Sequence, residues 1–110
     1  MERYEVVVTP SADTDIDGIF AYISKKLKGP DVAIGLIERI YKSLKTLEIL
    51  PKRHALSRDK FLANQGFRSI KTGNYLAFYV VDDDAHTVVI HRVLHGRRNY
   101  AALFGASEIT

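Results

Sequence analysis

The chain contains no cysteine. This absence excludes disulfide bonds, catalysis by a thiolate and zinc bound by cysteine, and it fits a reducing cytoplasm. No stretch approaches the ~18 consecutive apolar residues of a membrane-spanning helix, and we find no repeats or low-complexity tracts. The N-terminal residues lead directly into an alternating strand pattern, so we expect no signal peptide. Together these absences favour a cytoplasmic protein without a membrane partner.

Positive charge is concentrated in the second half of the sequence. The 110 residues are enough for one domain with its own core, and we predict a single domain over residues 1–110. Residues 1–50 carry seven Lys/Arg and eight Asp/Glu, whereas residues 51–110 carry nine and five, together with all four histidines. The second half therefore builds either a solvated basic face or a surface for nucleic acid or an acidic partner segment.

Apolar residues repeat at helical spacing in two segments of the first half. Residues 3–9 precede them as a strand pattern. We predict Ser11 as the N-cap of the first helix, Gly29-Pro30 as its end, and a second helix from Asp31 to about Ile49. Two amphipathic helices with a short link predict an antiparallel hairpin packed on a core. Its buried stripes are expected to contain Ile16, Phe20, Ile23, Ile37, Ile40 and Leu44.

The second half of the chain has the pattern of a strand meander. Residues 52–66 are polar and irregular, and turn residues then separate the strand segments 67–71, 75–81 and 87–94. In the first of these segments Phe67 and Ile70 fall on opposite faces. A short helical turn is expected at Leu103-Phe104. The element order predicts an α+β fold: an N-terminal strand and a helix hairpin packed on a mostly antiparallel sheet, completed by a C-terminal three-stranded meander.

Three segments of this meander carry a family resemblance: residues 66–71, 73–79 and 90–99. They are similar to the C-terminal half of ParE-type toxins, where an FRS and YLIFY strand pair precedes a strand end RVLHGRR. The first strand, which ends in Thr-Pro-Ser-Ala, and the helix after it are also similar, so the resemblance covers roughly residues 4–104. It implies a ParE/RelE superfamily toxin of a type II toxin–antitoxin system, with a cognate antitoxin as partner and plasmid stabilization as cellular role.

The superfamily that the chain resembles has two activities. RelE-like members cleave messenger RNA on the ribosome with basic residues and a C-terminal Tyr or His, whereas ParE-like members poison DNA gyrase. Leu76 stands where RelE-like nucleases carry an Arg, and Phe104 stands where they carry the Tyr. RNA cleavage needs a general base and charge stabilisation at the phosphate, so these apolar residues favour gyrase inhibition by binding. A ribosome-dependent endoribonuclease and a non-toxic nucleic-acid-binding module are the alternatives.

Basic residues of the meander are the candidate contacts to target or partner: Arg68, Lys71, His95, Arg97 and Arg98. Arg97 or Arg98 matches the strand-end arginine of the family, and Arg68 and Lys71 match basic positions of RelE-like enzymes on the preceding strand. The alternative for each is a solvated side chain that only maintains solubility.

Histidine and tyrosine side chains allow further expectations. His91 and His95 are expected on one face of the last strand. With His54 they lack the carboxylate or cysteine of a recognised ligand spacing, so we predict no metal site and no cofactor. Tyr75 and Tyr79 are expected in the core, with each hydroxyl hydrogen-bonded at its edge.

Overall fold

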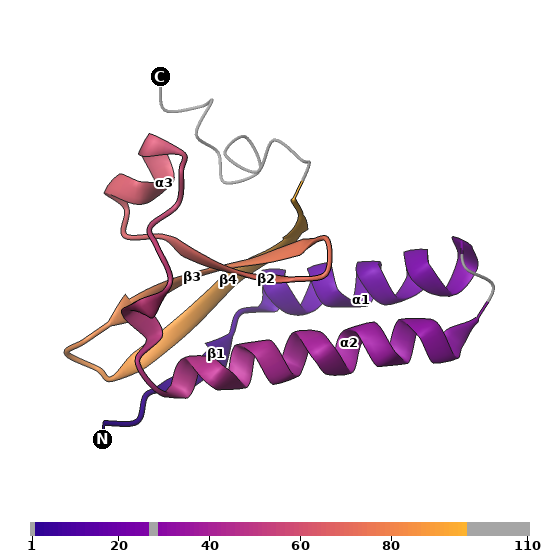
Figure 1. Cartoon of the computed structure of the whole chain (residues 1–110), viewed down its shortest axis with the longest axis horizontal. Coiled ribbons are helices and arrows are strands. Elements are labelled where there is room, and N and C mark those ends of the chain that lie inside the picture. Colours follow the sequence, from indigo (N-terminus) through magenta and orange to yellow (C-terminus); the bar gives the residue numbers. More distant parts are fainter. Residues whose placement is uncertain (1, 27–28, 97–110) are drawn as a thin grey trace.

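The computed structural model describes residues 2–26 and 29–96, and its centre is a four-stranded sheet (Figure 1). The strand order is β1-β4-β3-β2, with β1 parallel to β4 and the other neighbours antiparallel. The predicted α+β architecture, with an N-terminal strand and a C-terminal meander, is confirmed. The strands are β1 (Glu5–Val8), β2 (Arg68–Thr72), β3 (Tyr75–Asp82) and β4 (Thr87–His95).

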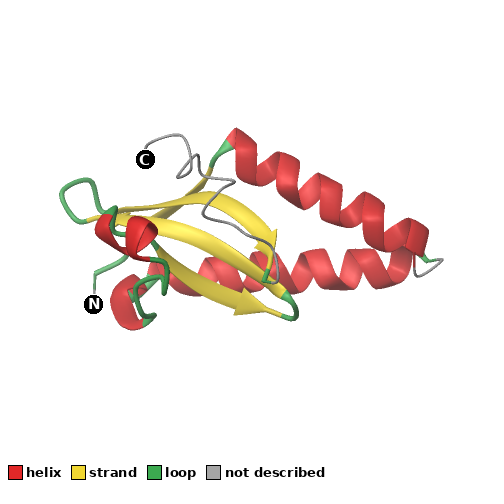
Figure 2. Cartoon of the chain, turned by 90° about the horizontal axis from the view of Figure 1, so that it is seen from above, coloured by secondary structure: helices red, strands yellow, loops and turns green. Residues whose placement is uncertain are grey.

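Two helices, α1 (Pro10–Lys26) and α2 (Pro30–Lys45), form the predicted hairpin on one side of the sheet (Figures 1 and 2). The N-cap prediction at Ser11 is wrong. The hydroxyl of Thr9 accepts a hydrogen bond from the backbone N–H of Ala12 at 3.2 Å, so Thr9 caps α1. Pro10 fits the first helical position because a backbone N–H there would have no partner within the helix.

The second helix ends earlier than the predicted Ile49. The chain continues as two short 3-10 helices, η1 (Thr46–Glu48) and η2 (Pro51–Arg53). The guanidinium of Arg53 donates to the carbonyl oxygens of Thr46, Ile49 and Leu50, at 3.2, 2.6 and 3.1 Å. These bonds add to the backbone hydrogen bonds that the Thr46 and Leu50 carbonyls accept from Ile49 and Arg53, so the carbonyls at the end of the helical region have partners.

The first apolar cluster lies between the hairpin and the sheet. It contains Ile16, Ile40 and Leu44 as predicted, with Ile23 and Ile37 partly buried against it. Phe20 is 38% exposed, so its predicted burial is wrong. Its neighbour Ile19 takes the inward position, and one residue along a helix turns the side chain by about 100°.

A second apolar cluster covers the opposite face of the sheet. It contains Leu62, Phe67, Phe78 and Leu94, and Leu62 comes from a short helix, α3 (Lys60–Asn64). The predicted irregular segment therefore includes local structure: the Asp59 carboxylate caps α3 by accepting from the N–H of Leu62 at 3.1 Å. Because Ile70 belongs to the first cluster, the prediction that Phe67 and Ile70 face opposite sides is confirmed.

A β-bulge at His91 divides β4 into two parts. Phe78 pairs with Arg92 and Tyr79 with Ile90, which leaves His91 as an extra residue. The His91 ring packs on Phe67 of the second cluster, whereas the His95 ring packs on Tyr75, which contacts the first cluster. The prediction that both histidines share a face is therefore wrong, because the extra residue reverses the alternation.

Some predictions concern residues outside the described ranges. The helical turn expected at Leu103-Phe104 is one of them. Among the helices that the structure describes, none is long and apolar enough to cross a membrane.

Candidate functional site

The end of β4 has an open edge, because its parallel neighbour β1 ends at Val8. Asp15 of α1 fills this edge. Its carboxylate accepts from the backbone N–H of Val93 at 3.0 Å and from Arg92 Nε and Nη2 at 2.7 and 2.8 Å. The hydrogen bond to Asp15 raises the pKa of the Arg92 guanidinium. This bidentate pair, in which the Asp15 side chain is only 12% exposed, holds the end of β4 against the middle of α1.

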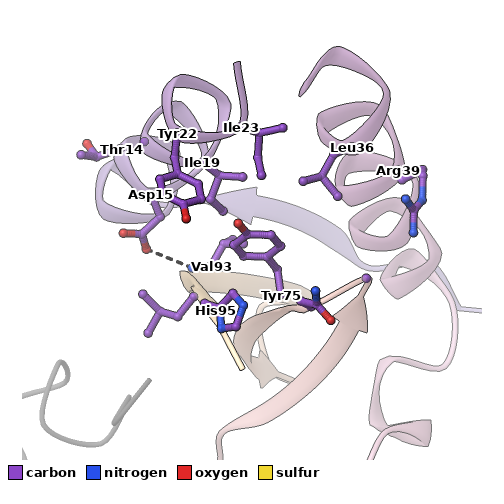
Figure 3. A pocket seen from close by; sticks show the side chains of 14 residues that line it. Thr14, Asp15, Ile19, Tyr22, Ile23, Leu36, Arg39, Tyr75, Val93 and His95 are labelled. Carbon is purple, nitrogen blue, oxygen red and sulfur yellow. Dashed lines mark hydrogen bonds between the residues drawn. The ribbon is translucent and has the colours of Figure 1, made fainter. Parts of the chain in front are cut away.

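A groove of about 750 Å³ opens beside this contact (Figure 3). We name it the helix–strand groove. Its walls are residues of α1 between Thr14 and Ile23, two residues of α2, the β2–β3 turn at Gly73–Tyr75, and Val93–His95 of β4. The turn needs a glycine, because Gly73 has a φ of +59°, which other residues rarely adopt. The groove therefore combines residues that are far apart in the sequence.

Aromatic and polar side chains give the groove its chemistry. Tyr22 and Tyr75 point toward one another across it (Figure 3). The Tyr75 ring packs edge-on against His95 at 5.4 Å, and burial raises the pKa of Tyr75. Arg39 lies at the rim near Gly73, and it makes no ion pair with any residue that the structure describes. The result is an apolar groove with a cation at its rim.

The structure places the predicted contact residues in different surroundings. Arg68 donates to the carbonyl oxygens of His54 and Lys52 at 2.6 and 3.2 Å, and so holds η2 on the sheet. Lys71 is exposed and lies opposite Leu76 in the register of β2 and β3. Its side chain is therefore on the sheet face that carries the second cluster. His95 lines the helix–strand groove on the opposite face. Arg97 and Arg98 lie outside the described residues.

At the end of the sheet that carries η2, polar groups also bond within the chain. The Tyr79 hydroxyl donates to the Pro51 carbonyl at 2.6 Å, so the predicted core role with a hydrogen-bonded hydroxyl is confirmed for Tyr79. It is wrong for Tyr75, which is only partly buried and lines the groove. Burial raises the pKa of Tyr79 to about 12. Hydrogen bonds from Lys52 and Tyr4 lower the pKa of Asp83. Within residues 2–26 and 29–96, no three His, Asp or Glu side chains are grouped to hold a metal ion.

Sequence reasoning missed the groove residues Tyr22 and Arg39. Both follow an apolar stripe residue by three positions, Ile19 in α1 and Leu36 in α2. This spacing puts them beside the stripes, on the same side of each helix. A helical projection could therefore have identified both as residues at the edge of the hairpin.

Comparison with known families decides the class of the protein. The model of the ParE toxin of type II toxin–antitoxin systems, parDE, matches residues 6–100. The chain belongs to the ParE toxin family. It is thus a ParE/RelE-type toxin of a toxin–antitoxin system, as the resemblance of the meander segments implied. No curated protein sequence matches the chain.

Solved structures share the fold of this toxin. A chain from the chromosomal ParDE system of P. aeruginosa is 20% identical, with a TM-score of 0.70 over 84% of this chain and 96% of that one. The RelBE2 toxin–antitoxin complex of Mycobacterium tuberculosis gives 26% identity and a TM-score of 0.57, over 84% and 98%. A mutant of the E. coli toxin RelE in the free state gives 14% identity and 0.66, over 98% and 99%. Two of these structures contain toxin–antitoxin systems, which supports an antitoxin as the partner of this toxin.

Proposed function

We propose that this toxin inhibits DNA gyrase by binding it in the cytoplasm, and that a cognate antitoxin neutralises it. The toxin acts as one domain over residues 1–110. Binding, and not RNA cleavage, is its mechanism. The observation that carries this proposal is the apolar surrounding of Leu76.

Leu76 occupies the β3 position where RelE-like nucleases carry an Arg. It packs against the second apolar cluster, and it lies 3.8 Å from where a Cβ on Gly96 would be. A cation at this position of a nuclease would stabilise charge at the scissile phosphate. Leu76 supplies no such charge, and its partial burial ties it to the core. This position therefore supports a toxin that acts by binding.

Basic residues next to the end of β4 are the proposed contacts to gyrase. The N–H of Gly96 donates to the Asn74 carbonyl at 2.8 Å, so the residue before Arg97 is attached to the β2–β3 turn. Arg97 and Arg98 follow in the sequence, and Lys71 is exposed near the same turn. We assign target binding to these three residues. Arg68 lies at the other end of β2, where it holds η2 on the sheet.

The test compares wild type with the double variant Arg97→Ala, Arg98→Ala. Each protein is incubated with gyrase and supercoiled plasmid, and separately with translating ribosomes. We expect wild type to cause gyrase-linked DNA breaks. The double variant should bind gyrase more weakly, because each charge-assisted contact contributes roughly 1.5–3 kcal/mol, and high salt should mimic it.

A matched control removes two exposed charges elsewhere. Lys25→Ala with Lys26→Ala at the end of α1 should leave the DNA breaks unchanged. Site-specific cuts in ribosome-bound messenger RNA, without DNA breaks, would contradict the proposal and make the toxin a RelE-type endoribonuclease.

A further inference from the structure

The hairpin exposes apolar side chains on a side that does not face the sheet. Phe20, Ile34 and Tyr41 are 38, 46 and 44% exposed. They belong to neither apolar cluster, and none of them lines the helix–strand groove. Ile34 and Tyr41 are about two helical turns apart, so they lie on one face of α2. No described helix or strand covers this face (Figure 1).

Tyr41 shows how the two helices lie beside each other. Burial raises the pKa of Tyr41, and the nearby carboxylates of Asp13 and Asp17 raise it further. Phe20 follows Asp17 by three positions, so it lies on the same face of α1. Because the helices are antiparallel, Phe20 lies at a level between Tyr41 and Ile34. We call the surface around these three apolar residues the outer hairpin face.

The charges around the outer hairpin face are self-complementary. In α1 the carboxylate of Asp17 comes before the apolar centre of the face, and the ammonium of Lys25 comes after it. In α2 Asp31 comes before the centre and Lys42 after it. All four side chains are exposed, and none makes an ion pair with any residue that the structure describes. Asp31 and Lys42 are about 16 Å apart along the helix, so they cannot pair with each other.

One two-fold axis fits the charges of both helices. In α1 the midpoint between the two charges falls one residue after Phe20. In α2 it falls between Leu36 and Ile37, which lie at the level of Phe20 in the antiparallel hairpin. An axis at this level, perpendicular to the helices, places each acidic residue opposite the basic residue of the same helix in a second copy. Such a symmetric contact needs only one surface that carries both charges.

We propose that two copies of this toxin associate through the outer hairpin face, with Phe20 of both copies at the two-fold axis. Each helix then lies antiparallel to the same helix of the second copy, as in a four-helix bundle. Asp17 of each copy faces Lys25 of the other, and Asp31 faces Lys42. The end of β4 packs against the other side of the hairpin, so the dimer leaves it open. Exposed ion pairs are weak, so we expect a dissociation constant of roughly micromolar size and a monomer on dilution.

The first experiment tests the apolar centre of the face. Analytical ultracentrifugation of the purified full-length toxin over a range of concentrations measures the dimer. Phe20→Glu places two carboxylates at the axis and should weaken the dimer by roughly tenfold or more. Tyr22→Glu adds the same charge to the groove side of α1, so it should leave the dimer unchanged. The Tm of each variant, measured on diluted protein, shows that the monomer is folded.

The second experiment reverses the charges of α2. Asp31→Lys alone and Lys42→Glu alone each place like charges opposite one another, so each should weaken the dimer by roughly tenfold. The double variant restores opposite charges across the axis and should recover the wild-type dissociation constant. Both changes oppose the helix dipole, so a purely structural defect would instead be larger in the double variant. Arg39→Glu, an exposed cation of α2 on the groove side, is the control and should have no effect.

Three outcomes overturn the inference. The first is a toxin that stays monomeric up to millimolar concentration. The second is a dimer that Phe20→Glu leaves intact, or that Tyr22→Glu weakens equally. The third is a double charge reversal that does not restore the dimer. None of these outcomes affects the proposed inhibition of gyrase, because the DNA breaks test that proposal separately.

Discussion

The two ends of the sheet use the same residue types in different ways. At the end that carries η2, Tyr79 and Arg68 are hydrogen-bonded to backbone carbonyls of the chain. At the end with the helix–strand groove, the side chains of Tyr75 and Arg39 make no hydrogen bond or ion pair with the described residues, and the Tyr75 ring packs on His95. Tyrosine and arginine thus stabilise the fold at one end and remain accessible to a partner at the other. Residue type alone does not distinguish these roles.

The largest expected effect comes from the ion pair between Asp15 and Arg92 at the groove end. Asp15→Ala removes the carboxylate that accepts from Arg92 and from the N–H of Val93. Breaking a buried ion pair costs about 3–5 kcal/mol. This pair is partly exposed, so we expect the free energy of unfolding to fall by about 2–3 kcal/mol. Urea denaturation measures the loss.

Asp17→Ala is the control for this prediction. Asp17 is an exposed carboxylate of the same helix, and its removal should change the free energy of unfolding by less than about 0.5 kcal/mol. Equal losses in the two variants would show that the contact between Asp15 and β4 does not stabilise the groove end.

A smaller effect is expected when one tyrosine from each end is replaced by phenylalanine. Tyr79→Phe removes a buried hydroxyl and leaves the Pro51 carbonyl without its donor, which should cost about 1–2 kcal/mol. Tyr75→Phe removes a hydroxyl at the groove, and we expect a loss below about 0.5 kcal/mol. Thermal or urea unfolding at neutral pH measures both. If the free energy of unfolding falls as much in the Tyr75 variant as in the Tyr79 variant, the two ends of the sheet do not differ in how they use tyrosine.

The same two variants have a second readout at high pH. Burial raises the pKa of Tyr79 to about 12, so between roughly pH 10 and 12 the unfolded chain releases a proton that the folded chain keeps. The free energy of unfolding therefore falls as the pH rises through this window. Tyr79→Phe should reduce this pH dependence, and Tyr75→Phe should keep most of it.

The smallest effect should have the opposite sign. Gly18→Ala is expected to raise the free energy of unfolding of the free toxin by about 0.5–1 kcal/mol, because alanine favours the helix and its Cβ meets no described atom. Gly35→Ala should give the same gain. A loss at Gly18 alone, measured by urea denaturation, would mean that glycine is needed for folding at that position.

Much of the fold could be predicted from the sequence because its signals are local. The helical stripes and the turn residues at Gly73-Asn74 located the hairpin and the meander. Competing local signals gave the errors: Thr9 and Ser11 are both good caps, and Ile19 and Phe20 both fit the stripe. Only the packing of α1 on β4 decides between them.

The candidate site was harder to predict, because its residues meet only in the folded chain. Arg68 resembles a surface cation in the sequence, yet it donates hydrogen bonds to the carbonyls of Lys52 in η2 and of His54 directly after it. The groove brings together Tyr22, Arg39 and His95 from three elements. No local sequence pattern shows that these three residues lie close together.

The extra residue at His91 shifts the alternation of side chains along β4, so the parts before and after it differ in which residues face the hairpin. We call these two parts the first and second phase. Val88 and Ile90 face the hairpin in the first phase, and Val93 and His95 face it in the second. In the segment that resembles the family most, Arg92 to Arg98, the described residues Arg92 to Gly96 lie entirely in the second phase. The number of residues in β4 before this segment therefore matters: one residue more or fewer would exchange the two faces of the segment. A related toxin without the extra residue can keep every residue of this segment and still present the opposite side chains to the hairpin.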